Sequence, residues 1–187
     1  MLRATLILIS YLAILSACSN VPTRPGGVEG ISDSEYFSII RSNTSHTDRY
    51  SGFYQTFQAD MTIESTEMLT AALKRKANFQ QWTSGQYQAE REKVLQEATA
   101  YSRFFLRFYS PEKDYDDLAK DKSAWKIYLD LDGQRFEGKV KKLKDKYGDL
   151  QNIYPYLDRF SSPYELTFNV PMSTVEGARS ESHSRVL

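Results

Sequence analysis

The stretch YSGFYQTFQADMTI, residues 50–63, decides the fold class of this 187-residue chain. Hydrophobic and polar side chains alternate along it, and the odd positions are largely apolar: Phe53, Phe57, Ala59, Met61 and Ile63. A period of two indicates a half-buried strand, which is typical of antiparallel sheets. Gln55 interrupts the apolar face, so we expect it near a strand end or with its amide bonded to a neighbour.

The periodicity changes after residue 64 and predicts a helical hairpin over about 65–101. Ser65 or Thr66 is a suitable N-cap, and apolar residues then follow at helical spacing as far as Trp82. Thr83 and Gln86 have the spacing of a capping box, which indicates a second helix after a turn containing glycine.

The remaining elements are predicted to be strands. Residues 103–109 form an aromatic strand, and the charged segment 112–122 is a loop or a short solvated helix. The segment 125–140 has the alternation of a hairpin whose strands meet at Asp132-Gly133, the preferred pair for a type I′ turn. A last strand covers 164–170, and the polar tail 173–186 ends in a weak edge strand. The sequence therefore predicts an α+β fold, an antiparallel β-sheet or β-sandwich that carries the helical hairpin.

The first residues have the character of a secretory signal peptide. Arg3 gives a positive start, and the apolar stretch that follows is too short to span a bilayer, which takes about 20 residues. Leu15-Ser16-Ala17-Cys18 resembles the lipobox of bacterial lipoprotein precursors. The resemblance implies removal of residues 1–17, acylation of Cys18 and anchoring in a lipid bilayer. Ser19 resembles the pattern of lipoproteins sorted to the outer membrane, facing the periplasm or the exterior.

Three regions follow from this interpretation. Residues 1–17 are the signal peptide, and residues 18–33 are the lipidated N-terminus and a flexible tether rich in Gly and Pro. Residues 34–187 then form a single globular domain. A domain of this size buries about two-thirds of its unfolded surface, so it needs no disulfide. We expect no cofactor.

The composition argues against nucleic acid as a partner. Lys plus Arg and Asp plus Glu each number 24 in the chain, and a neutral balance gives no long-range attraction for a polyanion.

Motifs for catalysis and metal binding are missing from the sequence. His46 and His183 lie in polar segments without an HExxH or Cys/His pattern, so we interpret both as solvated loop histidines and predict no metal site. Asp130 and Asp132 begin like a calcium loop, but the position that needs a carboxylate is Lys139. The GxSxG pattern of serine hydrolases is absent from the sequence. The two tryptophans, which in another setting would stack on sugars, have the spacing of core residues.

One charge cluster has two interpretations. It comprises Lys139, Lys141, Lys142, Lys144 and Lys146. These lysines either contact anionic lipid or an acidic partner, or they protect a strand from edge-to-edge pairing. We favour the second interpretation because a strand sends alternate side chains to opposite faces.

The sequence thus predicts a membrane-anchored envelope lipoprotein without catalytic activity that binds an envelope protein or a glycan. The alternative is a small envelope hydrolase that acts on cell-wall or lipid material.

Overall fold

The computed structural model describes residues 26–184, with side chains as far as residue 180. The predicted signal peptide, Cys18 and the tether as far as residue 25 lie outside the described residues. The elements are, in order, α2 (Asp33–Asn43), β1 (Thr44–Ser51), β2 (Tyr54–Ile63), α3 (Thr66–Phe79), α4 (Ser84–Ala98), β3 (Ser102–Tyr109), the 3₁₀ turn η1 (Lys113–Tyr115), β4 (Tyr128–Leu131), β5 (Gln134–Glu137), β6 (Lys139–Lys142), α5 (Tyr147–Ile153), β7 (Ser162–Phe168) and α6 (Met172–Ser184).

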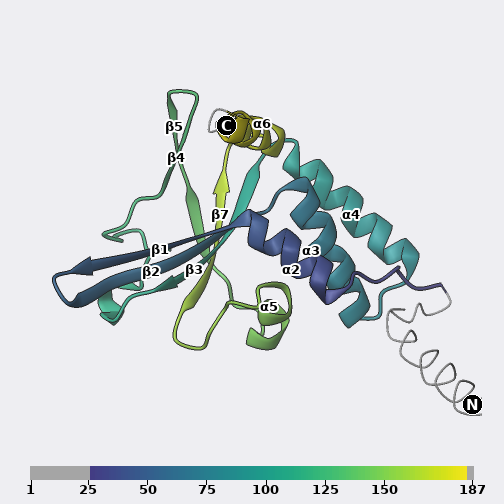
Figure 1. Ribbon diagram of the computed structural model, residues 1–187, viewed down its shortest axis with the longest axis horizontal. Coiled ribbons are helices and arrows are strands. Elements are labelled where there is room, and N and C mark those ends of the chain that lie inside the picture. Colours follow the sequence, from purple (N-terminus) through teal and green to yellow (C-terminus); the bar gives the residue numbers. More distant parts are fainter. Residues whose placement is uncertain (1–25, 185–187) are drawn as a thin grey trace, which may run out of the picture.

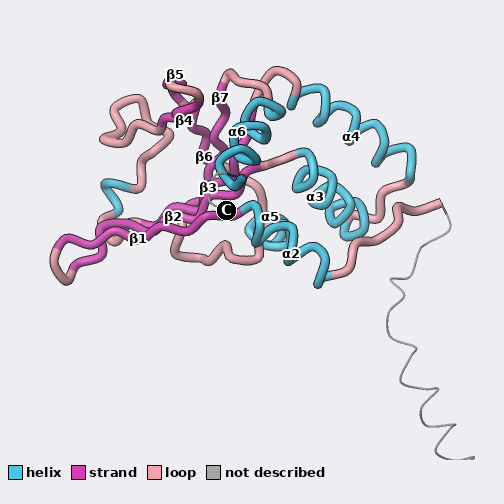
Figure 2. Tube along the Cα trace, turned by 45° about the horizontal axis from the view of Figure 1, so that its top comes forward, coloured by secondary structure: helices cyan, strands magenta, loops and turns pink. Residues whose placement is uncertain are grey.

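The architecture is α+β, as the sequence predicts. Five antiparallel strands form one sheet in the order β1-β2-β3-β7-β6, and β4 and β5 form a separate ribbon. The predicted helical hairpin is α3 and α4. These two helices lie beside α2 on one side of the molecule, while the β1–β2 hairpin extends from the other side (Figures 1 and 2).

The helix starts use the caps that the sequence indicates. Ser65 Oγ accepts a hydrogen bond from the Met68 N–H at 3.2 Å. At the start of α4 the Thr83 N–H donates to Gln86 Oε1 at 2.8 Å, and the Gln86 N–H donates to Thr83 Oγ1 at 3.3 Å, which completes a capping box.

Both faces of the sheet are covered, and strand β3 accordingly carries large apolar side chains on both of its faces. Phe104, Leu106 and Phe108 point into a core that also receives the β4–β5 ribbon and α6. Phe105, on the opposite face, packs with α2, α3 and the segment after α5, where its ring stacks on Tyr154. A strand buried on both faces has no polar side to alternate with.

The β1–β2 hairpin, called the arm below, extends beyond the rest of the sheet. Pairing of β2 with β3 spans only Gln58 to Ile63, so residues 54–57 pair with β1 alone. The predicted strand thus begins at Tyr54 rather than at residue 50. Gln55 lies near its start with its amide 3.4 Å from the Tyr50 hydroxyl, as expected. Phe53 was predicted to point inward and is instead fully exposed at the turn, because Gly52, with φ of 61°, reverses the chain there.

The hairpin predicted over 125–140 is correct in its turn and wrong in its return strand. Asp132 and Gly133 both have positive φ, at 49° and 78°, as a type I′ turn requires. The return strand β5 ends at Glu137, and β6 then leaves the ribbon to pair with β7. Gly138 permits this crossing because a Cβ there would lie 2.9 Å from the ring of buried Phe168.

Three further features correct or extend the sequence analysis. The tail forms helix α6 rather than a weak edge strand, since Met172 and Val175 share a helical face that is buried in the core. The elements α2, β1 and α5 were not predicted. The described part of the predicted tether contacts the domain, because Gly27 pairs with Thr83 and Val28 packs beside α3 and α4.

Candidate functional site

A cavity of about 280 Å³ lies at the base of the arm, where α2 continues into β1. Eight residues line it: Phe37, Ile40, Arg41, Thr44, His46, Asp60, Pro155 and Tyr156. The first three come from one face of α2, the next two from β1, and Asp60 from β2. The last two follow α5 in the chain. The lining residues are up to about 120 positions apart in the sequence, so no local motif marks the site.

His46 stands on strand β1 rather than in a solvated loop, and this corrects its interpretation from the sequence. The β1–β2 register places it opposite Asp60, and its Nδ1 lies 2.6 Å from Asp60 Oδ1. Its Nε2 lies 3.1 Å from Oδ2 of Asp48, two residues along on the same face. Hydrogen bonds to Asp60 and Asp48 raise the pKa of His46 above its ordinary value of 6.5. Histidine therefore holds two neighbouring carboxylates together. His183 lies beyond residue 180, the last residue whose side chain is described.

Arg107 links Asp60 to the segment after α5. Its Nη1 donates to Asp60 Oδ2 at 2.6 Å, its Nη2 to Gln58 Oε1 at 2.9 Å, and its Nε to Asp158 Oδ2 at 3.0 Å. Burial by itself would lower the pKa of Arg107, but the hydrogen bonds to Asp158 and Asp60 outweigh it and raise the pKa. The pKa of Asp158 is lowered. Partial burial would raise it, but the hydrogen bonds from Arg107 outweigh the burial. Arg107 therefore stays charged and fixes the arm to the sheet.

The hydrogen bonds of these groups leave little capacity for catalysis. Both oxygens of Asp60 and both ring nitrogens of His46 already have partners. The hydroxyls of Thr44 and Tyr156 are both bonded to Thr62 Oγ1. A general base or a metal ligand needs a free lone pair directed into the cavity. Arg41 alone among the polar lining side chains has no hydrogen bond or ion pair to any described residue.

The predicted lysine cluster is distributed over both faces of the edge strand β6. Lys139 and Lys141 share one face with their β7 partners, and Lys141 lies 4.0 Å from Glu165. Lys142 points to the opposite face with Tyr164. Lys144 and Lys146 follow the strand. This placement fits the edge-protection interpretation, whereas contact of these lysines with an anionic surface remains a prediction.

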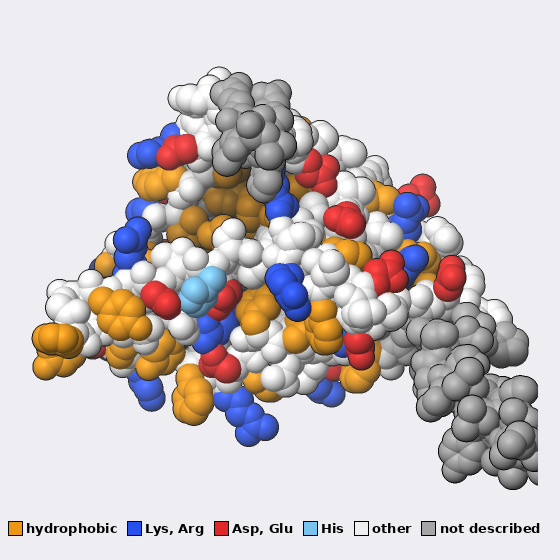
Figure 3. Space-filling model, viewed as in Figure 1, with side chains coloured by type: hydrophobic (Ala, Val, Ile, Leu, Met, Phe, Trp, Pro, Cys, Tyr) orange, Lys and Arg blue, Asp and Glu red, His pale blue; other side chains and the backbone are white. Residues whose placement is uncertain are grey.

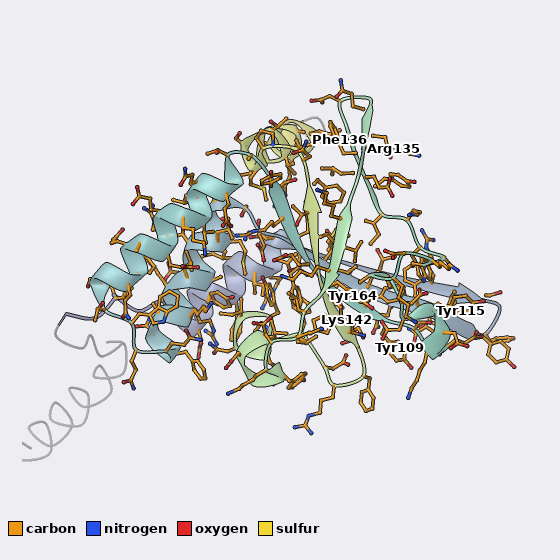
Figure 4. All side chains as sticks on the ribbon, turned by 180° about the vertical axis from the view of Figure 1, so that it is seen from behind. Tyr109, Tyr115, Arg135, Phe136, Lys142 and Tyr164 are labelled. Atoms are coloured by element: carbon orange, nitrogen blue, oxygen red, sulfur yellow. The ribbon has the colours of Figure 1, made fainter. Side chains whose placement is uncertain are left out.

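Lys142 belongs to a polar cluster that secures the loop after β3 (Figure 4). Its Nζ lies 2.8 Å from Ser162 Oγ and 3.4 Å from Asp116 Oδ2. Ser162 Oγ donates to Asp116 at 2.5 Å, and the Tyr164 hydroxyl donates to the other oxygen at 2.9 Å. A serine beside a lysine suggests a nucleophile, but Ser162 is buried and its proton is held by Asp116. The cluster is structural.

Other residues singled out in the sequence also have structural partners. Trp125 packs edge-on against Phe57 and Phe108, and Trp82 packs near α3 and α4, so neither presents an open platform for a sugar. Asp130 is bound by Arg135 through two hydrogen bonds. In the described part of the chain, no group of three or more His, Cys, Asp and Glu side chains is arranged to hold a metal ion.

The free end of the arm carries a cluster of three exposed aromatic side chains. Tyr50, Phe53 and Tyr54 are 60%, 103% and 83% exposed. Figure 3 shows hydrophobic side chains at the far end of the arm. The alternation of the sequence does not predict this patch, because it assigns Phe53 to the core. The Gly52 turn is the local signal that indicates otherwise.

No helix within residues 26–184 is both long enough and apolar enough to cross a membrane. In the comparisons with known proteins, no family model, curated protein sequence or solved structure matches this chain.

Proposed function

We propose that this chain is an envelope lipoprotein that binds another envelope protein, without catalysis, through the aromatic end of its arm. The observation that carries the proposal is the exposure of Tyr50, Phe53 and Tyr54 at the tip of a projecting hairpin. Aromatic side chains contribute a large share of the energy of protein interfaces, and an exposed cluster of them marks an interaction surface.

The position of the arm favours a partner other than the anchoring bilayer. The described chain starts beside α4, where the Ser84 N–H donates to the Gly26 carbonyl at 3.2 Å. This point lies at the end of the molecule opposite the tip of the arm (Figure 1). A lipid on Cys18, only eight residues before Gly26, would hold that end near the membrane and direct the arm away from it.

Ion pairs near its base also fix the arm relative to the rest of the domain. His46 and Arg107 connect β1 and β2 to the body of the domain through Asp60, close to the base of the hairpin. A contact surface that is held in place loses less conformational entropy on binding. The hydrolase alternative gains no support from His46 or Ser162, because their hydrogen bonds are already satisfied.

The arm is tested by a triple substitution, Tyr50→Ser, Phe53→Ser and Tyr54→Ser, in the full-length protein. After mild solubilisation of the envelope, the unmodified protein should retain a stoichiometric partner that the triple variant loses. Phe160→Ser is the matched control, since Phe160 is 86% exposed but lies in the segment before β7. Equal partner recovery from the triple variant would contradict the proposal.

The anchor is tested separately by Cys18→Ser. The unmodified protein should incorporate labelled palmitate and sediment with membranes, and the variant should do neither. Labelling of the variant would show that the acylated residue is not Cys18. This result would leave the role of the arm untouched.

A further inference from the structure

We propose that the cavity at the base of the arm binds a small organic carboxylate that bears one aromatic or branched aliphatic group, with Arg41 as its ion-pair partner. The proposal concerns the lining residues of this cavity and is independent of the aromatic tip. It follows from three properties of the site: its apolar walls, its size, and the Arg41 guanidinium, which is the one cation of the lining without a partner among the described residues.

The walls are mainly apolar. Phe37 and Ile40 contribute from α2, and Pro155 and Tyr156 close the opposite side. An apolar group of the ligand would therefore be removed from water without placing an unsatisfied polar group against the walls.

The polar groups of the lining select the charge of the ligand. Asp60 is neutralised by His46 and Arg107, and His46 also holds Asp48. A cationic ligand thus finds no free carboxylate in the lining. A sugar, which needs several donors and acceptors, finds the hydroxyls of Thr44 and Tyr156 already bonded.

Arg41 remains for the ligand. It lies in the last turn of α2 and lines the cavity, and it has no side-chain partner among the described residues. A guanidinium group binds a carboxylate through two parallel hydrogen bonds, which is the strongest pairing that the lining offers.

The volume of the cavity limits the length of the ligand. The cavity volume of about 280 Å³ lies just below the usual range for ligand sites, which is about 300 to 1,000 Å³. One ring or branched chain with a short link to the carboxylate fits this space. Both a free carboxylic acid and the last residue of a peptide have this chemistry.

The test is a ligand titration of the full-length protein in a non-ionic detergent, with empty micelles as the blank. The probes are 3-phenylpropionate, its neutral amide, and the peptide acid acetyl-Ala-Phe. Calorimetry or saturation-transfer NMR up to about 10 mM covers dissociation constants near 1 mM. We expect at least one of the two acids to bind, and the amide to bind about tenfold more weakly or not at all.

Arg41→Gln should produce the same loss as the amide, and Arg49→Gln is the matched control because Arg49 is exposed on β1 and does not line the cavity. Binding of the peptide acid alone would assign the site to a chain terminus, and binding of phenylpropionate alone to a free acid. Equal binding of acid and amide, full binding by Arg41→Gln, or no binding of either acid would overturn the proposal.

Discussion

His46 shows how a single side chain can connect an extended hairpin to its sheet. It lies between Asp48 and Asp60, so its ring, when protonated, neutralises charge that would otherwise accumulate on one face of β1 and β2. Arg107 compensates the second oxygen of Asp60 from the next strand. These bonds explain why polar side chains occupy a face that is covered elsewhere by helices.

The His46 bonds predict a pH dependence of stability with a definite sign. Because the pKa of His46 is raised above 6.5 in the folded state, its contribution is complete below that pH and is lost as the pH rises through the folded value. Asp48, whose pKa is lowered from 3.8, contributes above that pH and loses its contribution as the pH falls through its folded value. Both contributions are present together between these two ordinary values.

His46→Gln should therefore lower the melting temperature more at a pH of about 5.5 than at about 8.5. Thermal melts of both proteins at the two pH values measure the difference. Asp48→Asn should reduce the pH dependence without removing it, since Asp60 remains. A gap between wild type and His46→Gln that stays the same at both pH values would contradict the role assigned to the histidine.

Two glycines form a matched pair for testing backbone strain. Gly133 has φ of 78° in the β4–β5 turn, whereas Gly177 lies within helix α6 and is not in the positive-φ region. An added Cβ meets no atom within 4 Å at either site, so packing does not enter the comparison. Gly133→Ala should cost about 1–2 kcal/mol of unfolding free energy. Gly177→Ala should add about 0.5–1 kcal/mol. Denaturant unfolding gives both values, and a neutral Gly133→Ala would place the turn elsewhere.

At the scale of elements, local signals determined what the sequence could predict. The caps at Ser65 and Thr83 and the Asp132-Gly133 turn are encoded within a few residues, and all three are confirmed. Strand β6 was assigned to the wrong partner because pairing with β7 depends on residues that are distant in sequence.

The candidate site was invisible to sequence analysis for the same reason. Its lining comes from α2, β1, β2 and the segment after α5, and two of these elements were not predicted at all. Strand β1 is polar from Thr44 to Arg49 because it is an exposed edge, so it lacks the alternation by which strands are recognised. The pair His46 and Asp48, two residues apart, was the available signal once a strand was assumed.

The N-terminal segment of the described chain provides a prediction about element packing. Residues 26–32 hold Val28 and Ile31 against the helices and supply Ser32, the N-cap of α2. A protein that starts at residue 33 should be less stable than one that starts at 26 by about 2–4 kcal/mol, from two partly buried side chains and one cap. Urea unfolding of the two proteins measures the difference. Equal stability of the two proteins would show that this segment is part of the flexible tether, as the sequence predicts.

At the scale of the whole molecule, the two covered faces of the sheet predict independent folding. Residues 26–187 contain no cysteine, and the cores on both faces are built from the chain's own side chains. This fragment should unfold in one cooperative transition at the same midpoint with or without EDTA and reductant. A lower midpoint in EDTA would show a bound metal that contributes to stability.

The two edges of the sheet also differ in a way that suits a protein with one contact surface. Edge β6 is four residues long and carries lysines on both faces, which discourages pairing with another chain. Edge β1 is eight residues long and leads to the aromatic tip. The lysines on β6 therefore protect one edge of the sheet from pairing with another chain, and the arm at the other edge is open to contact.

Site-specific photocrosslinking in intact cells tests the role of the arm most directly. A photoreactive phenylalanine analogue replaces Phe53 in one full-length protein and Phe160 in another, since both side chains are almost completely exposed. The proposed function predicts a discrete adduct of higher mass, containing a second protein, from position 53 and no such adduct from position 160. No adduct from position 53, or the same adducts from both positions, would contradict it.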